Sequence, residues 1–258
     1  MDYSNVFDGL TEGQRSVIEH ILHSFVAPVE TTILEGSWLV TRKWNDAFEA
    51  RIRSHHALSE EPLSREQFEV ALAEACRLDG WDVVDASSAT QRFYDVELFR
   101  DGDGKVGKRY SLKSSSAKAM KRTHIHISKL CEAAWIQDAR KQSVRRAKII
   151  SLFDEYTATV EGILMLRCFR KGAVHLYELV EIPSALFEPV QKITLSQAQE
   201  STIKIPPSTS EPDSDVSSID PDLKLRLDRS DAKVTIADIR LDRCIVHARW
   251  KLSVKSLV

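Results

Sequence analysis

Two short segments in the middle of the chain most strongly limit the fold that it can adopt. Residues 93–99 (FYDVELF) and 108–114 (KRYSLKS) both alternate apolar and polar side chains, which is the period of a β-strand. The turn between them is rich in Asp and Gly and favours a hairpin. We therefore expect Asp95 on one strand, with Ser111 and Lys113 sharing a face of the next.

Helical patterns come before this hairpin. Thr11 is a candidate N-cap for residues 11–26, where apolar side chains recur at helical spacing. Residues 34–53 indicate a second helix. His55 and His56 follow it, and they suit cationic caps of its negative end better than a pair of metal ligands.

A third helix begins at Ser64, with a glutamine at the capping-box position, and ends at Gly80. Beyond the hairpin, residues 128–156 predict one long helix or two, with Ser128 as the N-cap and Glu132 in the first turns. Further strands are predicted in the C-terminal tail and at residues 81–86, 162–169 and 173–182.

The net charge of -2 conceals an uneven distribution of charge. Residues 104–131 contain basic residues and no acidic ones, whereas residues 178–222 are strongly acidic. A basic middle region suits a polyanionic partner. A solvated helix face next to a basic loop would give the same pattern, so charge alone leaves both interpretations open.

Composition limits the cellular setting and the class of protein. With 43% hydrophobic residues the chain can bury a substantial core. No apolar run approaches the roughly 20 residues of a membrane span, and the acidic N-terminus does not predict a signal peptide. The four cysteines are scattered without a CxxC pair, which argues against a structural zinc site and favours the reducing cytoplasm.

The polar groups of the hairpin match the needs of phosphodiester hydrolysis. That reaction requires a divalent cation that polarises water, and positive charge that stabilises the extra-negative transition state. Magnesium prefers carboxylate oxygens and completes its shell with water and phosphate. One or two carboxylates and a lysine on adjacent strands would meet these needs, and Asp95 and Lys113 are predicted to lie in that arrangement.

The order of helix, strand, hairpin, SLK strand, basic loop, helix and two strands over roughly residues 64–182 resembles the PD-(D/E)xK nucleases. Within that superfamily the chain is most similar to type II restriction endonucleases with an SxK variant of the motif. Tyr94 stands where the motif has proline, and Ser111 stands at the middle acidic position. The loop that follows Lys113 is longer than in those relatives.

The resemblance implies a role for each residue of the site. Asp95 and Glu132 would bind Mg²⁺, and the Leu112 carbonyl would be a further ligand. Lys113 would orient the attacking water and stabilise the transition state, and Ser111 would mark the abandoned acidic position. Glu69 would be an outer ligand from the preceding helix, unless it is an ordinary solvated surface residue.

The loop after the SLK strand combines hydroxyl, cationic and imidazole side chains. Such groups can contact phosphates and read base edges in the major groove. We expect this loop to bind DNA, although an exposed strand or a His-x-His metal site would have the same composition. The candidate DNA-binding residues are Ser114, Ser115, Ser116, Lys118, Lys121, Arg122, Thr123, His124 and His126.

The C-terminal strand RCIVHARWKL carries Arg243, His247, Arg249 and Lys251. These side chains could contact DNA, or they could protect an exposed sheet edge from association. The sequence favours neither interpretation over the other.

The expected elements predict an α/β domain with a mixed central sheet flanked by helices, and the resemblance implies that its fold is restriction-endonuclease-like. We expect four regions. They are an N-terminal helical region (1–60) that offers a dimer interface, a catalytic core (61–195), a flexible Ser/Pro/Asp-rich loop (196–222) and a C-terminal β-appendage (223–258).

The function expected from the resemblance is that of a type II restriction endonuclease. A cytoplasmic homodimer would use Mg²⁺ to cut double-stranded DNA at a short palindrome and leave 5′-phosphates. The alternatives are a DNA-binding protein without catalysis, a repair or junction nuclease of the same fold, and an interaction protein that docks through residues 196–222.

Overall fold

The computed structural model describes residues 8–85, 92–100, 107–207 and 220–254. Its central element is a seven-stranded sheet with the strand order β1-β11-β7-β6-β4-β3-β2. The strands β4 and β6 run parallel, and every other neighbouring pair is antiparallel. The strands are β1 (Val29–Ile33), β2 (Asp82–Asp85), β3 (Val96–Phe99), β4 (Lys108–Ser115), β6 (Gly162–Lys171), β7 (Val174–Pro183) and β11 (Ile245–Ser253). The predicted mixed sheet is confirmed.

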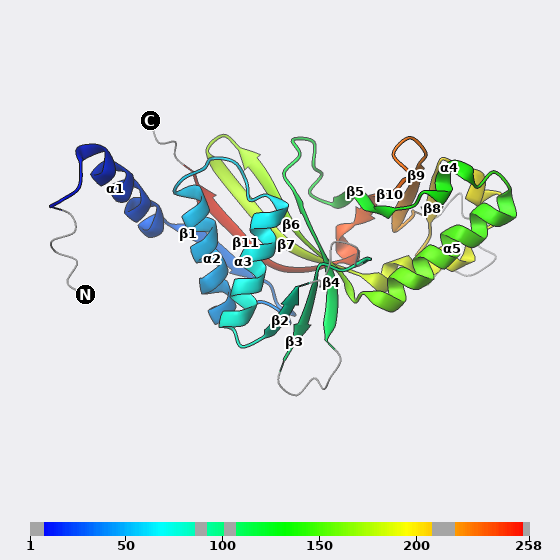
Figure 1. The fold of residues 1–258 in the computed structure, drawn as a ribbon, viewed down its shortest axis with the longest axis horizontal. Coiled ribbons are helices and arrows are strands. Elements are labelled where there is room, and N and C mark those ends of the chain that lie inside the picture. Colours follow the sequence, from blue (N-terminus) through cyan, green and yellow to red (C-terminus); the bar gives the residue numbers. More distant parts are fainter. Residues whose placement is uncertain (1–7, 86–91, 101–106, 208–219, 255–258) are drawn as a thin grey trace.

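A second, four-stranded antiparallel sheet has the order β5-β10-β9-β8. Its strands are β5 (His124–Glu132), β8 (Thr202–Ile205), β9 (Leu223–Asp228) and β10 (Lys233–Arg240). Figure 1 shows this sheet beside α5 at one end of an elongated molecule, while α1 projects from the opposite end.

The helices begin where the sequence provides caps. Thr11 and Ser64 both form complete capping boxes, each with the glutamine three residues later. After β7, Ser184–Lys192 forms a 3-10 helix. The α-helices are α1 (Glu12–Val26), α2 (Arg42–His56), α3 (Arg65–Leu78), α4 (Trp135–Asp138) and α5 (Gln142–Thr159). Within the described ranges, no helix has the length and apolarity needed to cross a bilayer.

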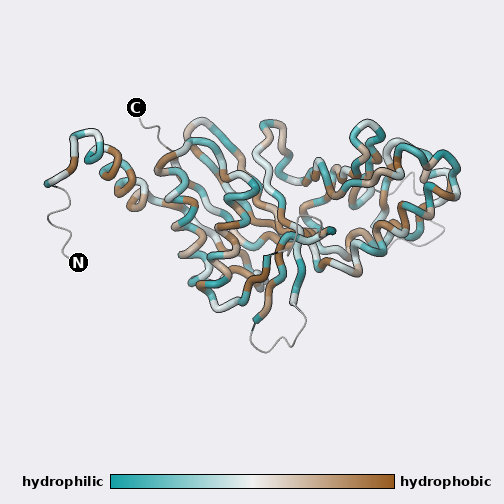
Figure 2. The backbone as a smooth tube through the Cα atoms, viewed as in Figure 1, coloured by the Kyte–Doolittle hydropathy of each residue, from teal (hydrophilic) through white to brown (hydrophobic). Residues whose placement is uncertain are grey.

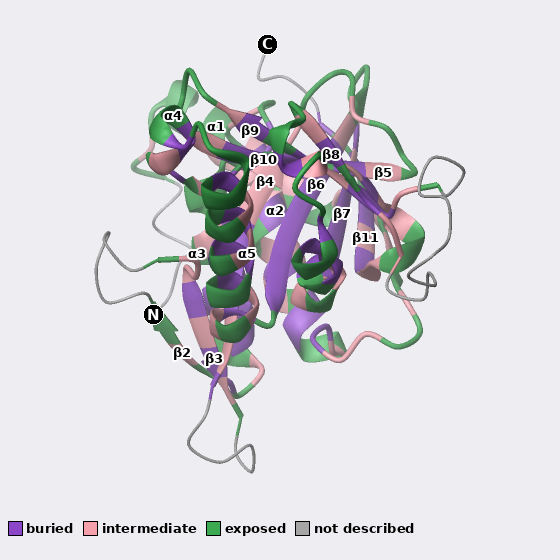
Figure 3. Ribbon diagram, turned by 90° about the vertical axis from the view of Figure 1, so that its right-hand side faces the viewer, coloured by how far each residue is buried: buried purple, intermediate pink, exposed green. Residues whose placement is uncertain are grey.

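The apolar core forms two clusters, one on each face of the central sheet. Ile163 and Met165 of β6 belong to the cluster shared with α5 and the second sheet. Leu164 and Leu166 belong to the cluster beneath α2 and α3. Because both faces are covered, β6 is an almost continuous apolar run, and Figures 2 and 3 show it as hydrophobic and buried.

The structure corrects the helix predicted at residues 128–156. Its first part is β5, so Ser128 is a strand residue and caps no helix. Ile125 and Ile127 pack into the core at a period of two, which identifies the segment as a strand. A helical segment resumes only at Trp135, and the long helix only at Gln142.

The structure also corrects the predicted start of the second helix and the predicted role of His56. The second helix begins at Arg42, capped by Thr41, and residues 29–33 form a strand that pairs with β11. His56 ends α2 but is not a cationic cap. Burial lowers its pKa to about 4, and its ring nitrogens contact the Ser59 carbonyl and the Tyr177 hydroxyl at 2.8 Å each. The imidazole is therefore neutral at pH 7.

The C-terminal strand is not an edge strand, because β11 lies between β1 and β7. His247 is completely buried, with Nε2 3.1 Å from Glu181 Oε2. Arg249 donates to the buried Glu178 at 2.8 Å. The polar side chains of β11 therefore serve largely to pair buried carboxylates inside the sheet.

Part of the predicted flexible loop is ordered structure. Within residues 196–222, Gln197–Gln199 form a 3-10 turn and Thr202–Ile205 form β8, an edge strand of the second sheet. Ile203 and Ile205 are buried against the core. Residues 208–219 of the predicted loop lie outside the described residues, as does most of the turn predicted at residues 100–107.

Candidate active site

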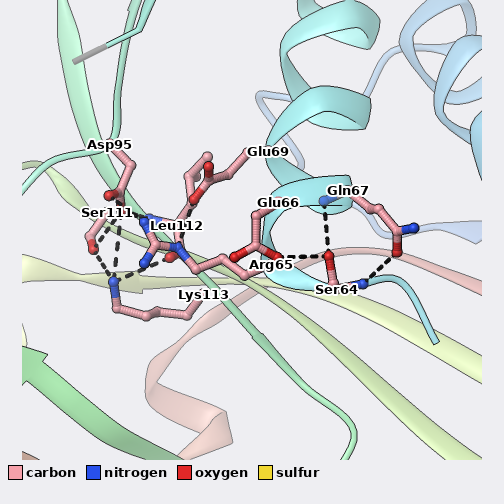
Figure 4. A network of polar contacts seen from close by, with 9 residues as sticks. All are labelled: Ser64, Arg65, Glu66, Gln67, Glu69, Asp95, Ser111, Leu112 and Lys113. Atoms are coloured by element: carbon pink, nitrogen blue, oxygen red, sulfur yellow. Dashed lines mark hydrogen bonds and ion pairs between the residues drawn. The ribbon is translucent and has the colours of Figure 1, made fainter. Parts of the chain in front are cut away.

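Asp95, Ser111 and Lys113 meet at the central sheet, as the alternation of the hairpin predicted, although Asp95 stands just before β3 and not on the strand itself. Ser111 Oγ donates to Asp95 Oδ2 at 3.1 Å, and the Leu112 N–H donates to the same oxygen at 2.6 Å. Lys113 Nζ donates to Ser111 Oγ at 2.7 Å and to the Leu112 carbonyl at 3.2 Å, and lies 3.7 Å from Asp95 Oδ2. Figure 4 shows this network.

Backbone geometry holds Asp95 in this position. Asp95 stands immediately before β3, and its N–H donates to the Tyr110 carbonyl at 2.9 Å. Phe93, two residues earlier, has a φ of 78°, a left-handed conformation that costs energy for an aromatic residue. The chain therefore turns sharply before the strand and directs the carboxylate toward β4.

Lys113 is the central cation of the site. Its side chain is only 19% exposed. Burial lowers the pKa of its ammonium, and the nearby Asp95 carboxylate opposes that shift. An ammonium that is partly desolvated beside a carboxylate has strong local electrostatic interactions.

The first turn of α3 completes the polar cluster. Arg65 Nη2 donates to Asp95 Oδ1 at 2.9 Å, and Arg65 Nε donates to Glu69 Oε1 at 2.6 Å. Arg65 thus joins the two carboxylates (Figure 4). The i,i+4 spacing to Glu69 was visible in the sequence, but the contact of Arg65 with Asp95 depends on tertiary packing and was missed.

These atoms suit a hard divalent cation. The Asp95 and Glu69 carboxylates and the Leu112 carbonyl supply oxygen, the ligand type that Mg²⁺ prefers. Magnesium is commonly held by one or two carboxylates together with water and substrate phosphate. In the described part of the chain, no three His, Cys, Asp or Glu residues gather as a metal cluster.

Glu132 lies apart from this network. It ends β5 instead of standing on a helix, its side chain is 77% exposed, and it accepts a hydrogen bond from Lys129 at 2.6 Å. The preceding residue, Cys131, faces inward, where burial raises the pKa of its thiol to about 11 and the nearby Arg92 and Lys113 oppose that rise. Successive strand residues point to opposite sides, so Glu132 points away from Lys113.

The predicted DNA-binding loop connects β4 to β5 and so joins the two sheets. Ser114 and Ser115 end β4, and His124 and His126 lie on β5. A cavity of about 290 Å³ beneath the loop is lined by side chains from both sheets. Most of the loop, including Ser116, Lys118, Arg122 and Thr123, is exposed or half-buried.

Arg167, which the sequence did not single out, anchors this loop. Its side chain is 1% exposed and donates to the Glu178 carboxylate at 2.9 Å. The same guanidinium donates to the backbone carbonyls of Lys121 and His124. A buried arginine on β6 therefore fixes the loop just before β5.

Comparison with known proteins identifies the class. A family model described as SmaI, a type II site-specific deoxyribonuclease, matches residues 3–252. The chain is also 24% identical over 219 residues to the type II restriction enzyme SmaI of Serratia marcescens, a match that covers 80% of this chain and 78% of that enzyme. No solved structure matches the chain.

The protein is therefore a type II restriction endonuclease, a hydrolase that cuts DNA internally. Within that class it belongs to the SmaI family. This membership confirms the expected enzyme class and its DNA substrate. It favours restriction over the three alternatives, namely a non-catalytic DNA-binding protein, a repair or junction nuclease and an interaction protein.

Proposed function

We propose that the protein hydrolyses double-stranded DNA in a Mg²⁺-dependent reaction at the cluster of Asp95, Ser111 and Lys113. The observation that carries this proposal is the contact of Lys113 Nζ with Ser111 and Leu112, 3.7 Å from the Asp95 carboxylate. It supports the proposal because the carboxylate that would bind the metal lies beside the ammonium that would stabilise charge.

Asp95, Glu69 and the Leu112 carbonyl are the proposed metal ligands. A bound Mg²⁺ would supply Lewis-acid polarisation of water and of the scissile phosphate. Arg65 bridges the two carboxylates in this structure, so its guanidinium lies within reach of a phosphate held at the same site. Glu132 stays a predicted ligand from the resemblance, but its exposed position on β5 makes Glu69 the better placed carboxylate.

The protein groups have separable roles in this proposal. The Lys113 ammonium orients the attacking water and stabilises the charge that develops on the phosphate. Ser111 fixes the Lys113 amine, because Ser111 Oγ accepts its hydrogen bond while donating to Asp95. This arrangement supports assignment to the PD-(D/E)xK superfamily, with Ser111 at the middle acidic position of an SxK motif.

The β4–β5 loop is the proposed DNA-binding element. It departs directly from β4, the strand that carries Lys113, so DNA held by the loop would lie close to the cluster. Its candidate contacts combine cations with hydroxyl and imidazole groups, which suits both phosphates and base edges. These candidates are Ser114, Ser115, Ser116, Lys118, Lys121, Arg122, Thr123, His124 and His126.

We further propose a homodimer that cuts a palindrome and leaves 5′-phosphates. Two active sites related by a two-fold axis match two antiparallel strands. Helix α1 supports this proposal, because none of its residues is buried and Val17, Leu22 and Phe25 are exposed apolar side chains. Figure 2 shows apolar residues along α1.

The proposed compartment is the cytoplasm. All four cysteines are free thiols. Cys76 and Cys168 are buried, and Cys131 and Cys244 are half-buried. Unpaired thiols are compatible with a reducing compartment.

Digestion of a long unmethylated duplex of known sequence, with and without Mg²⁺, tests the proposed reaction. The expected result is discrete fragments that form only with the metal and that ligate without prior phosphorylation, as 5′-phosphate ends do. Equal cleavage after removal of all divalent metal would exclude the Mg²⁺-dependent reaction.

A further inference from the structure

The outer face of the second sheet is polar although its inner face is core. Ile127, Leu225 and Ile236 point inward into the apolar cluster beneath α5. The alternating residues point the other way, and register places Arg226 of β9 opposite Thr235 of β10. This outer face lies next to the β4–β5 loop and takes no part in the proposed catalytic cluster.

A β-bulge interrupts the outer face. Ile236 pairs with Ile127, and Ile239 pairs with Ile125, so two residues of β10 oppose the single His126 of β5. One of these two, Asp238, has a φ of 50°, in the left-handed region. Bulges redirect side chains and are over-represented near functional sites.

The bulge gathers a set of charged groups that we name the bulge cluster: Lys121, His126, Lys224, Arg226 and Asp238. Asp238 accepts a hydrogen bond from Lys224 Nζ at 2.8 Å and lies 3.5 Å from Lys121 Nζ. The Lys224 hydrogen bond is the largest of the effects that lower the pKa of Asp238, so this carboxylate is an ionised acceptor at neutral pH.

The other members of the bulge cluster can donate. The pKa of His126 is lowered by burial first and by Arg226 second, so its imidazole is mainly neutral at pH 7 and has one donor and one acceptor. The Arg226 side chain is exposed and forms no hydrogen bond or ion pair with any other residue that the structure describes, although its backbone pairs with β8 and β10. Its guanidinium is therefore available to a ligand.

The bulge cluster is continuous with the proposed active site. All of its members except Lys224 line the cavity of about 290 Å³, together with Ser115 of β4. Ser115 stands two residues after Lys113 on the same strand. A duplex with its scissile phosphate at Lys113 would thus extend toward the cavity.

We propose that the bulge cluster reads base edges of the DNA, with Arg226 and Asp238 as specificity-determining residues. Base edges present both donors and acceptors, and this cluster offers cationic donors beside a fixed carboxylate acceptor. Phosphates present acceptors alone, so a carboxylate held at this position would weaken a purely phosphate-binding surface. This inference rests on the proposed DNA-binding role of the β4–β5 loop.

The test compares Arg226→Gln and Asp238→Asn with Lys204→Gln as a matched control. Lys204 pairs in register with Lys224 and is exposed, but it lies on the edge strand β8 outside the cavity. Fragment ends cut by the wild type define its cognate sequence. Binding to that duplex and to duplexes with single base-pair changes is then measured without Mg²⁺ at several salt concentrations.

The measured quantity is the affinity for the cognate duplex divided by the affinity for a duplex with one changed base pair. We expect Arg226→Gln and Asp238→Asn each to reduce this ratio by roughly ten- to a hundred-fold, the scale of one good base contact. The salt slope should stay near the wild-type value, and Lys204→Gln should alter neither quantity. An unchanged ratio in both cavity variants would overturn the inference. So would an equal loss on all sequences with a salt slope lower by about 0.9, which indicates a phosphate contact.

These measurements separate the inference from the proposed catalytic cluster. Binding without Mg²⁺ requires no cleavage, whereas the catalytic proposal is judged by cleavage in Asp95 and Lys113 variants. A loss of discrimination at Arg226 would therefore support base reading even if the catalytic residues proved to lie elsewhere.

Discussion

Among single residues, the proposed site is held by a few polar contacts between partly buried side chains. Asp95 is fixed by the Leu112 N–H and by Ser111, while Lys113 is held by Ser111 and the Leu112 carbonyl. Each charged group is thereby oriented before substrate arrives. Such preorganisation is what electrostatic stabilisation of a transition state requires.

The two candidate glutamates can be compared directly. We predict that Glu69→Gln lowers kcat at limiting Mg²⁺ by about ten-fold or more, because Glu69 shares Arg65 with Asp95. Glu132→Gln should change kcat at limiting Mg²⁺ by less than about three-fold, because the Glu132 carboxylate is exposed and pairs with Lys129. Mg²⁺ titrations of cleavage measure both effects, and the reverse ranking would identify Glu132 as the ligand.

His56 predicts a pH dependence of stability. Its pKa is about 4 in the folded protein and near 6.5 when exposed, so the unfolded chain binds the proton first as the pH falls. The contribution of the neutral, buried His56 to the free energy of unfolding is complete above about pH 6.5. It is lost progressively as the pH drops toward 4. His126 and His175, whose pKa values are also lowered by burial, act in the same direction.

The measurement is the decrease in unfolding temperature between pH 7 and pH 5. We expect His56→Gln to show a smaller decrease than the wild type, whereas His23→Gln, on the exposed side of α1, should keep the wild-type decrease. An identical pH dependence in His56→Gln would show that this imidazole is not the neutral, buried group described here.

Among helices and strands, those specified by neighbouring residues were predicted better than those that depend on pairing between distant segments. Thr11 and Ser64 specify their helices through side chains within three residues, so both helix starts were readable. The part of β5 from Ser128 onward was missed because its alternation is short, and its pairing partner β10 lies about a hundred residues later. Arg65 and Arg226 were missed for the same reason, since their surroundings are assembled from distant segments.

The start of α3 links helix capping to the site. We predict that Ser64→Ala costs about 1 kcal/mol of stability and also lowers cleavage, because Arg65 and Glu69 lie in the first turns of that helix. Thr11→Ala removes the same kind of capping box from α1 and is the matched control. Chemical denaturation and cleavage assays measure the two effects.

Cleavage by Ser64→Ala equal to that of Thr11→Ala would mean that the start of α3 does not position the site. A selective loss of cleavage in Ser64→Ala would support the placement of Arg65 and Glu69 beside Asp95.

At the scale of the whole molecule, the structure extends from the projecting α1 at one end to the second sheet at the other (Figure 1). The sequence predicted the mixed sheet, the N-terminal helices and the C-terminal β-structure. It could not predict that β11 returns to the central sheet between β1 and β7, because that pairing is long-range. The predicted domain boundaries remain predictions.

The exposed apolar side of α1 leads to a prediction about assembly. If α1 forms the dimer interface, Leu22→Glu combined with Phe25→Glu should convert a dimer to a monomer, because charges cannot be buried unpaired in the interface. Light scattering of the wild type and the variant gives the masses. A variant that stays dimeric would place the interface elsewhere, and Glu12→Lys on the same helix serves as the control.

Asp95 and Lys113 are the proposed catalytic centre, and the decisive experiment is single-turnover cleavage of the cognate duplex by Asp95→Asn and Lys113→Ala. We predict that each variant cleaves at least about a hundred-fold more slowly, while Mg²⁺-free DNA binding and the unfolding temperature stay near wild type. The control Lys129→Ala, an exposed lysine on β5, should cleave normally. Cleavage within a few-fold of wild type in both site variants would contradict the account.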